Sequence, residues 1–303
     1  MEKAAMMQTA QEMVESFVDL PTIPHVATRV IELLDRPGVE LDEVADMILA
    51  DQVLAARVIK MVNSPLYKPA NEIKSVKRAL IYLGFRHIRE LAFTCSFVDV
   101  FEGRDGIFDV RTFWEHSFGV GVVSKIIAQR VRYPDTEKAY LVGIVHDIGE
   151  VFLSYYRQDT FRALLDSVKG QPFRLVEKEA EYLGTSHSEI GLCIARKWNF
   201  PADYCEVIGL HHDPEQAVLD PTLCAIVNLA DLFCSVRQLD YGGSSWVTFN
   251  LAEEKAWAIL KSYAPNLADL DVERFCYELD DRVPEIQDMV KSIFQGIGAK
   301  ETS

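Results

Sequence analysis

Several features that mark large classes of protein are missing from this sequence. No apolar run reaches the ~20 residues that a membrane helix needs, and the charged segment 1–19 lacks the apolar core of a signal peptide. The six cysteines show no Cys-x-x-Cys spacing, and in helix-like surroundings they are typical of buried thiols in a reducing cytoplasm. We therefore expect a cytoplasmic protein that does not enter a membrane. The cysteines are Cys95, Cys193, Cys205, Cys224, Cys234 and Cys276.

Positive charge is also scarce. The net charge of −15 argues against general nucleic-acid binding, since contacts with phosphates need clustered basic residues. Yet segment 57–89 holds eight basic residues and one acidic residue, so it carries +7 and the rest of the chain carries −22. Such a run is most often a solvated face. The alternative is a docking surface for an acidic signalling protein or a phosphate-bearing small ligand. The eight residues are Arg57, Lys60, Lys68, Lys74, Lys77, Arg78, Arg86 and Arg89.

The alternation of apolar and polar residues that marks β-strands is absent, and almost every stretch has helical periodicity. The 303 residues suffice for one large helical domain or for two smaller ones. A polar, glycine-rich segment at 102–106 favours a boundary between domains. We therefore predict an all-α protein with an N-terminal helical subdomain at 1–105 and a second helical domain, which includes the C-terminal helices, at 106–303.

Capping residues and helix breakers predict where many helices begin and end. Asp51, Ser75, Asp109, Ser186 and Asp220 are expected to cap helices. The helices expected in the first half cover about 26–34, 41–50, 52–62, 76–83, 85–100 and 110–129, with Gly84 separating the fourth from the fifth. Those expected in the second half include one carrying His146 and Asp147, then 160–168, 173–184, one after Ser186, one from Pro201 to His211-His212, one carrying Asp231, and 251–263, 272–279 and 284–294.

His146 and Asp147 stand side by side within the otherwise apolar run 140–148. Burying an ionised carboxylate without a partner costs many kcal/mol, and ion pairing or metal coordination are the usual remedies. No lysine or arginine occurs between Lys138 and Arg157 to act as a local partner. Five of the seven histidines fall within 116–212, and Asp231 is embedded in another apolar helix. This constellation indicates a metal site.

Taken singly, most of these residues have an ordinary structural interpretation. His116 on an apolar helical face suits a hydrogen-bonded core histidine, His187 in a first helical turn suits a surface position, and Asp231 suits a helix cap. The adjacent pair His146-Asp147 and the complete ordered set favour metal ligands instead. Imidazole and carboxylate together suit iron, manganese, zinc, cobalt or nickel, and seven ligands are enough for two ions. The seven candidates are His116, His146, Asp147, His187, His211, His212 and Asp231.

The order of these residues resembles the HD superfamily of metal-dependent phosphohydrolases, and segment 146–149, His-Asp-Ile-Gly, is similar to its name-giving motif. Segments 20–24, 50–54, 62–67 and 75–84 are similar to the HDOD family, the HD-related output domains of bacterial signalling. The resemblance covers about residues 17–239. It implies an HD-superfamily helical bundle and a role as a signal-transduction output module.

The resemblance also implies a ligand assignment. One ion would be held by His116, His146, Asp147 and Asp231, and Asp147 would bridge to a second ion held by His187, His211 and His212. The expected cofactors are two transition-metal ions, with iron, manganese, zinc or nickel as the candidates. The chain departs from the cyclic di-GMP phosphodiesterase branch at two points. Segment 213–217 lacks the Gly-Tyr-Pro signature, and Glu150 replaces a lysine, which adds negative charge near the cleft and disfavours a phosphate substrate.

Three functions are compatible with this pattern. The first is a signalling module with a structural metal site, the second is a phosphohydrolase acting on a nucleotide or cyclic dinucleotide, and the third is a di-iron oxygenase, for which there is no separate support. A phosphohydrolase needs cationic groups near its metal ions. No basic residue within 146–212 adjoins a candidate ligand in sequence, so the signalling module is preferred.

Overall fold

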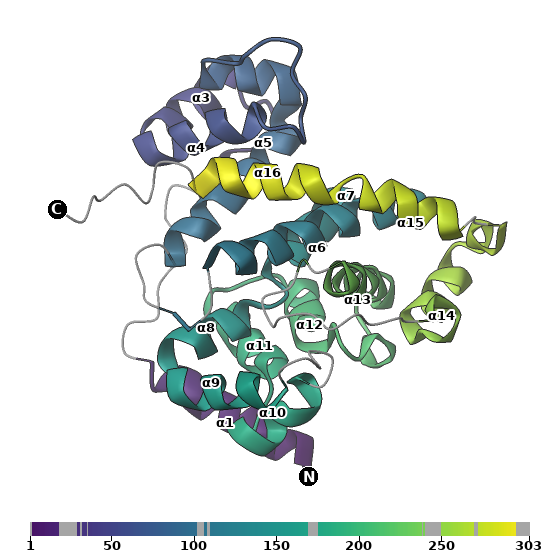
Figure 1. Cartoon of the computed structure of the whole chain (residues 1–303). Helices are drawn as coiled ribbons and strands as arrows, with labels where there is room; N and C mark the ends of the chain where they lie inside the picture. The colour runs from purple at the N-terminus through teal and green to yellow at the C-terminus, as the bar shows by residue number, and fades with distance from the viewer. Residues whose placement is uncertain are drawn as a thin grey trace. The chain divides into compact units, whose positions relative to one another are not determined.

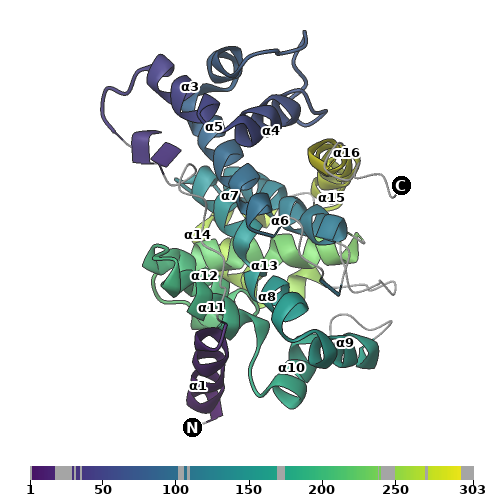
Figure 2. The same ribbon diagram turned by 90° about the vertical axis from the view of Figure 1, so that its left-hand side faces the viewer.

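The structure is a computed structural model in which the described elements are helical, as predicted, and in which no strand occurs among the described residues (Figure 1, Figure 2). It describes residues 2–17, 29–30, 32–34, 36–101, 106–107, 110–168, 175–237, 239, 250–269 and 272–294. Most of the predicted helix at 26–34, the boundary segment 102–105, the cap Asp109 and the predicted helix start at 173 lie outside the described residues. Within the described ranges, no helix combines the length and apolar character that a membrane span requires.

The chain forms two compact units. The larger comprises Met1–Leu20 and Arg104–Tyr277, and the smaller comprises Pro21–Gly103 and Glu278–Ser303. The crossover at 103–104 lies next to the predicted division at residue 105, but each unit also takes one end of the chain. The N-terminal helix packs against the larger unit and the last helix packs against the smaller one, because each of these helices buries an apolar face there.

The longest described helices of the smaller unit come from both the N-terminal half and the C-terminal part of the chain. They are α3 (Leu41–Leu49), α4 (Gln52–Val62), α5 (Val76–Phe101) and α16 (Val283–Phe294), which packs on α4. Asp51 caps α4 as predicted, since its carboxylate accepts the backbone N–H groups of Val53 and Leu54 at 2.9 and 3.0 Å. The predicted break at Gly84 is also confirmed, because this glycine has φ 76° inside α5, a conformation that costs other residues energy.

Several residues of the basic segment 57–89 are already engaged within this smaller unit. Arg57 is only 3% exposed and donates a hydrogen bond to the carbonyl of Cys95 at 3.1 Å. Lys77 pairs with Asp42 at 2.5 Å, and Lys74 pairs with Glu72 at 3.1 Å. Glu72 is already counted in the total of +7, but the burial of Arg57 and the pairing of Lys77 with Asp42 reduce the positive charge that the segment offers a partner.

The centre of the larger unit is a layer of long apolar helices. They are α6 (Val110–Arg130), α7 (Thr136–Val145) and α13 (Pro221–Val236). Helix α7 is buried at every position from Ala139 to Val145, which explains its apolar sequence. Helices α6 and α7 approach closely because glycines face each other: a Cβ on Gly143 would lie 2.9 Å from the Cα of Gly121.

The remaining helices of the larger unit surround this centre. They are α1 (Glu2–Glu15), α8 (Ile148–Tyr156), α9 (Gln158–Ser167), α10 (Leu175–Leu183), α11 (His187–Lys197), α12 (Ala202–Leu210) and α14 (Lys255–Tyr263), with short 3-10 turns η2 (Pro214–Gln216), η3 (Leu251–Glu253) and η4 (Pro265–Asp269). Helix α15 (Val272–Asp280) follows them along the chain. Helix α1, which the sequence did not single out, packs on α11, and Phe17 after it stacks on Tyr156 with ring centroids 4.3 Å apart. All six cysteines are thiols, and Cys95, Cys205, Cys224 and Cys234 are buried.

Candidate metal centre

The sequence predicts that His146 and Asp147 lie within a helix, but in the structure both lie in the turn between α7 and α8. His146 ends α7, and Asp147 precedes α8 with φ −96° and ψ 22°. Although it stands at the N-cap position, Asp147 makes no side-chain capping bond, so its carboxylate is directed to other partners. A turn suits this pair, because consecutive residues of a regular helix point about 100° apart and would not both face one site.

Gly149 allows the start of α8 to touch the start of α11. A Cβ at Gly149 would lie 1.9 Å from the carbonyl oxygen of His187 and 2.9 Å from the backbone nitrogen of Gly191. Both neighbours are backbone atoms, so only glycine fits. This close approach brings Asp147, at the start of α8, next to His187, the first residue of α11.

The other candidate ligands are positioned by helix ends and one helix interior. His187 is held by the predicted capping box, in which Ser186 accepts from the N–H of Glu189 and Glu189 accepts from the N–H of Ser186. His211 follows α12 directly, and its carbonyl accepts a hydrogen bond of 2.7 Å from Asn228 on α13. His116 projects from α6 and His212 follows His211, while Asp231 projects from α13.

The structure brings all seven predicted residues together around Asp147. Asp147 Oδ2 lies 3.2 Å from His146 Nε2 and 3.4 Å from His116 Nε2, while Oδ1 lies 3.2 Å from His211 Nε2 and 3.5 Å from His187 Nε2. The two carboxylate oxygens therefore face two different groups of imidazoles.

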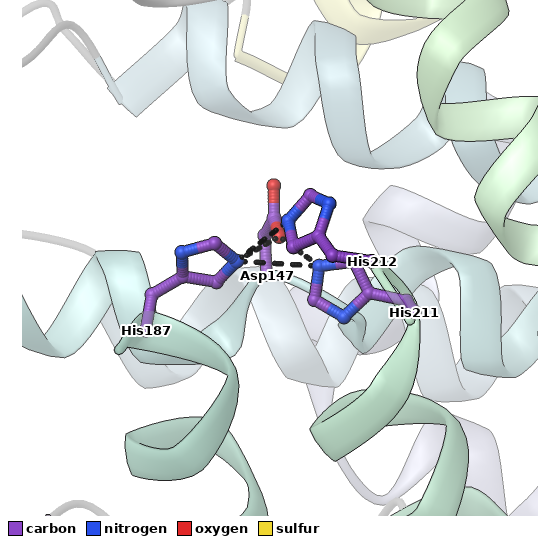
Figure 3. A group of neighbouring side chains, drawn as sticks. All are labelled: Asp147, His187, His211 and His212. Carbon is purple, nitrogen blue, oxygen red and sulfur yellow. Dashed lines mark hydrogen bonds and ion pairs between the residues drawn. The ribbon is translucent and has the colours of Figure 1, made fainter. Parts of the chain in front are cut away.

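Each group is compact enough to surround one ion. One group is His116, His146 and Asp231, and the other is Asp147, His187, His211 and His212, with the ligand atoms of each group within 4.8 Å of one another. Figure 3 shows the second group. In the second group, His187 Nε2 is 3.2 Å from His211 Nε2 and 3.0 Å from His212 Nε2. In the first, Asp231 Oδ1 is 3.3 Å from His116 Nε2. Nitrogen atoms that converge in this way repel one another unless they share a cation or a proton.

Four of the imidazoles are oriented by a hydrogen bond on the outer side of the ring. The Nδ1 atoms of His116, His146 and His211 lie 2.6, 2.8 and 2.9 Å from the carbonyl oxygens of Leu239, Gly143 and Ile208, and Nδ1 of His187 lies 2.7 Å from Glu179 Oε1. Because a carbonyl oxygen only accepts, each of the first three Nδ1 atoms carries the hydrogen. In the neutral form of each ring the Nε2 lone pair then points to the centre, the arrangement found in metal-bound histidines.

The nearby carboxylates make this buried site favourable for cations. Burial lowers the pKa of His146, but Asp147 and Asp231 outweigh that effect and raise it to about 9. Burial likewise lowers the pKa of His187, yet Glu179, Glu150 and Asp147 raise it to about 10. Positive charge is thus stabilised at both rings.

The pKa values of the other candidate ligands shift in both directions, and burial lowers that of His211. Burial lowers the pKa of His116, but Asp147 and Asp231 hold it well above the ordinary value of 6.5. Burial raises the pKa values of Asp147 and Asp231, but the surrounding histidines outweigh it and hold both well below 3.8. Burial, followed by neighbouring histidines, lowers the pKa of His212, whose side chain is the most exposed of the seven at 29%. Among the seven candidate ligands, His212 is therefore the one through which solvent most readily reaches the site.

The donor set fits metal ions. His146 Nε2 is fully buried and makes no hydrogen bond among the described residues, although Asp147 Oδ2 is 3.2 Å away. Two ligand atoms this close without hydrogen-bond alignment suit a common ion. One group offers three imidazoles and a carboxylate, and the other offers two imidazoles and up to two carboxylates, which are ligands that iron, manganese, zinc and nickel accept.

Two buried acidic residues adjoin the candidate ligands, and the sequence indicates only one of them. Glu179 on α10 is fully buried and contacts His187, but the charged segment 177–181 resembles an ordinary exposed helix face. Glu150, whose negative charge the sequence places near the site, is 2% exposed and lies 3.6 Å from His187 Nδ1, on the side of the ring away from the other ligands. The contact of Glu179 with His187 depends on how α10 and α11 pack, which the sequence does not show.

Comparison with known proteins identifies the family. The profile of the HDOD domain matches residues 20–214, and a crystal structure of an HDOD domain protein of unknown function from Geobacter sulfurreducens is 34% identical, with a TM-score of 0.85 over 96% of this chain and 99% of that one. The chain belongs to the HDOD family. The HD-superfamily helical fold predicted from sequence is thereby confirmed for this HDOD protein.

Other similarities to this HDOD chain are more distant. A candidate phosphohydrolase from Shewanella amazonensis SB2B is 22% identical with a TM-score of 0.72, covering 96% of this chain and 98% of that one. A candidate signal transduction protein from Marinobacter aquaeolei VT8 is 21% identical with a TM-score of 0.75, covering 97% of this chain and 66% of that one. An uncharacterised protein of Treponema pallidum is 22% identical over 201 residues, and the match covers 64% of this chain but 38% of that relative. These likenesses show the fold.

Proposed function

We propose that this HDOD protein is a signal-transduction output module that holds two transition-metal ions. The observation that carries the proposal is the position of Asp147, whose two carboxylate oxygens face two separate groups of imidazole Nε2 atoms. His116, His146 and Asp231 would hold one ion, and His187, His211 and His212 would hold the other. Asp147 would contribute one oxygen to each. Iron, manganese, zinc and nickel suit these donors.

The charge of the site favours a module over a phosphohydrolase. Four buried carboxyl groups, from Asp147, Asp231, Glu150 and Glu179, lie in or beside the ligand groups. Two divalent ions with four carboxylates have no net formal charge, so little positive potential remains to attract a phosphate. Phosphoryl transfer depends on such potential, because negative charge accumulates on the phosphoryl oxygens.

Elemental analysis tests the metal proposal directly. Protein purified without added metal should carry between one and two transition-metal ions per chain, and the double variant His146→Ala with Asp147→Ala should carry none and unfold at a lower temperature. A metal-free wild-type protein with undiminished thermal stability contradicts the proposal.

The second candidate is a metal-dependent phosphohydrolase acting on a nucleotide or cyclic dinucleotide. The completeness of both ligand groups is the observation in its favour. Two bound ions would supply Lewis acidity and an activated water. We expect little or no hydrolysis of cyclic di-GMP, because the Gly-Tyr-Pro signature is missing. Robust turnover that disappears in Asp147→Ala would overturn the preference for a signalling module.

We propose that any protein partner binds the basic face around Lys77 and Arg78. The double charge reversal Lys77→Glu with Arg78→Glu should weaken a salt-sensitive interaction with an acidic partner while the fold persists, since exposed ion pairs contribute about 0–1 kcal/mol. The existing pair between Lys77 and Asp42 limits the charge available here. Unchanged partner binding would leave the segment as a solvated face.

A further inference from the structure

Glu179 contacts His187 with both of its carboxylate oxygens. Oε1 lies 2.7 Å from the ring nitrogen Nδ1 of His187, and Oε2 accepts the backbone N–H of the same residue at 3.0 Å. Glu179 is fully buried, and His187 is 1% exposed. Such burial of a carboxylate is costly unless its oxygens are satisfied, and here a single residue satisfies both.

This double contact fixes the direction of the imidazole. The backbone bond holds the first residue of α11, and the bond to Nδ1 holds the plane of the ring. With Nδ1 donating outwards, Nε2 is directed to the centre, 3.5 Å from Asp147 Oδ1 and 3.0 Å from His212 Nε2. Ring rotation would leave Oε1 of Glu179 without its donor, while the backbone bond to Oε2 keeps the carboxylate in place.

Glu179 differs from the groups that orient the other buried histidines of the site. His116, His146 and His211 donate to neutral backbone carbonyls, whereas His187 donates to a carboxylate. A charged acceptor withdraws the Nδ1 proton more strongly, which makes Nε2 a more basic and stronger ligand. The His187 side of the site thus has an anionic support, whereas the described Nδ1 acceptors on the other side are neutral carbonyls.

A separate third metal site is the competing interpretation, because Glu150, Glu179 and His187 also lie close enough to surround an ion. The contacts decide against it. Both oxygens of Glu179 already accept from His187, and Glu150 Oε1 is 3.6 Å from Nδ1, outside hydrogen-bonding distance. A cation between these groups would have to displace the Nδ1 proton and the bond that orients the ring.

We propose that Glu179 is a positioning residue that sets the affinity of the metal position held by His187, His211 and His212. The inference rests on the proposed metal function of this site. A partner that orients a ligating histidine in this way typically changes metal affinity about 10- to 100-fold when it is replaced. The effect should be confined to this position, because among the described residues Glu179 makes its contacts in the site with His187 and not with His116, His146 or Asp231.

The test is Co²⁺ titration of the metal-free full chain, followed by visible absorption and chelator competition, for the wild type, Glu179→Gln and Glu181→Gln. Glu181 is the control, because it is also a glutamate of α10 but pairs with Lys178 at 2.5 Å and has a side chain that is 62% exposed. We expect Glu179→Gln to weaken one of the two Co²⁺ affinities about 10- to 100-fold and to shift the absorption of that ion. Glu181→Gln removes the same charge from the same helix and should leave thermal stability nearly unchanged and both affinities within about twofold of the wild type.

The outcomes separate the two proposals. If the wild type binds no Co²⁺, the metal function itself fails. If the wild type binds two ions and folded Glu179→Gln binds both with unchanged affinity and spectrum, only the role of Glu179 is overturned. Should Glu179→Gln not fold, Glu179→Asp keeps the charge but shortens its reach, and the same selective loss is expected; unchanged affinities in folded Glu179→Asp contradict the proposal.

Discussion

Replacement of Gly149 by alanine should damage the candidate metal centre more than alanine at any other described glycine, because its Cβ would make the closest backbone contact. The new Cβ would lie 1.9 Å from the carbonyl oxygen of His187, whereas real Cβ atoms essentially never approach a heavy atom within 3.0 Å. Helices α8 and α11 would therefore have to separate by about 1.1 Å at their starts. The obstacle is backbone, so no side-chain rotation relieves it.

The size of the effect follows from this displacement. Overpacking of a tight core costs about 1–3 kcal/mol. In a unit of this size each kcal/mol lowers the melting temperature by about 2–4 °C, so a decrease of roughly 2–12 °C is expected. The same movement carries His187 away from Asp147 Oδ1, now 3.5 Å from its Nε2. Metal–ligand distances tolerate errors of only about 0.2 Å, so Co²⁺ affinity should fall about tenfold or more.

The assay pairs thermal unfolding of metal-free protein with Co²⁺ titration, and Gly209→Ala is the control. A Cβ at Gly209 would meet Leu192 Cδ2 at 3.1 Å, a flexible side-chain atom that moves easily. Alanine also favours a helix by up to about 1 kcal/mol over glycine, so this control should be neutral or slightly stabilising. Wild-type melting temperature and Co²⁺ affinity in Gly149→Ala would refute the argument.

Three further predictions concern the bridge, a helix cap and an ion pair. Asp147→Asn should reduce bound metal to at most one ion per chain in elemental analysis, because one amide oxygen cannot serve two cations; two ions in this variant would contradict a bridging role. Asp51→Ala should cost about 1 kcal/mol in denaturant unfolding through loss of the α4 cap, with metal content unchanged as its control. Burial raises the pKa of Asp203, but its pairing with Lys138 outweighs burial and holds the pKa below 3.8. Burial lowers the pKa of Lys138, but Asp203 and Asp220 outweigh burial and hold the pKa above 10.5. The pair should therefore stabilise the fold between about pH 4 and 10.5 and lose this effect as the pH falls below or rises above that window, which a comparison of Lys138→Met with the wild type by thermal unfolding across pH checks.

The sequence by itself determined the helical elements and the identity of the candidate ligands. Asp51, Gly84 and the capping box at Ser186 have local effects, because capping and positive φ depend on a few neighbouring residues, and the structure confirms all three. The charged pair in the apolar run 140–148 identified a buried site for a similar reason, since the cost of burial can be read from composition. The structure places all seven predicted residues together, and that they bind metal stays a prediction.

Only the tertiary structure decided how these residues meet. The sequence does not reveal the turn at His146-Asp147, because the apolar residues continue from α7 into α8 on both sides of it. Glu179 appears as one charge among several in segment 177–181, and its burial against His187 depends on the packing of α10 and α11. The two oxygens of Asp147 likewise face histidines that come from helices far apart in sequence. Their distances depend on how those helices pack, which local sequence preference does not determine.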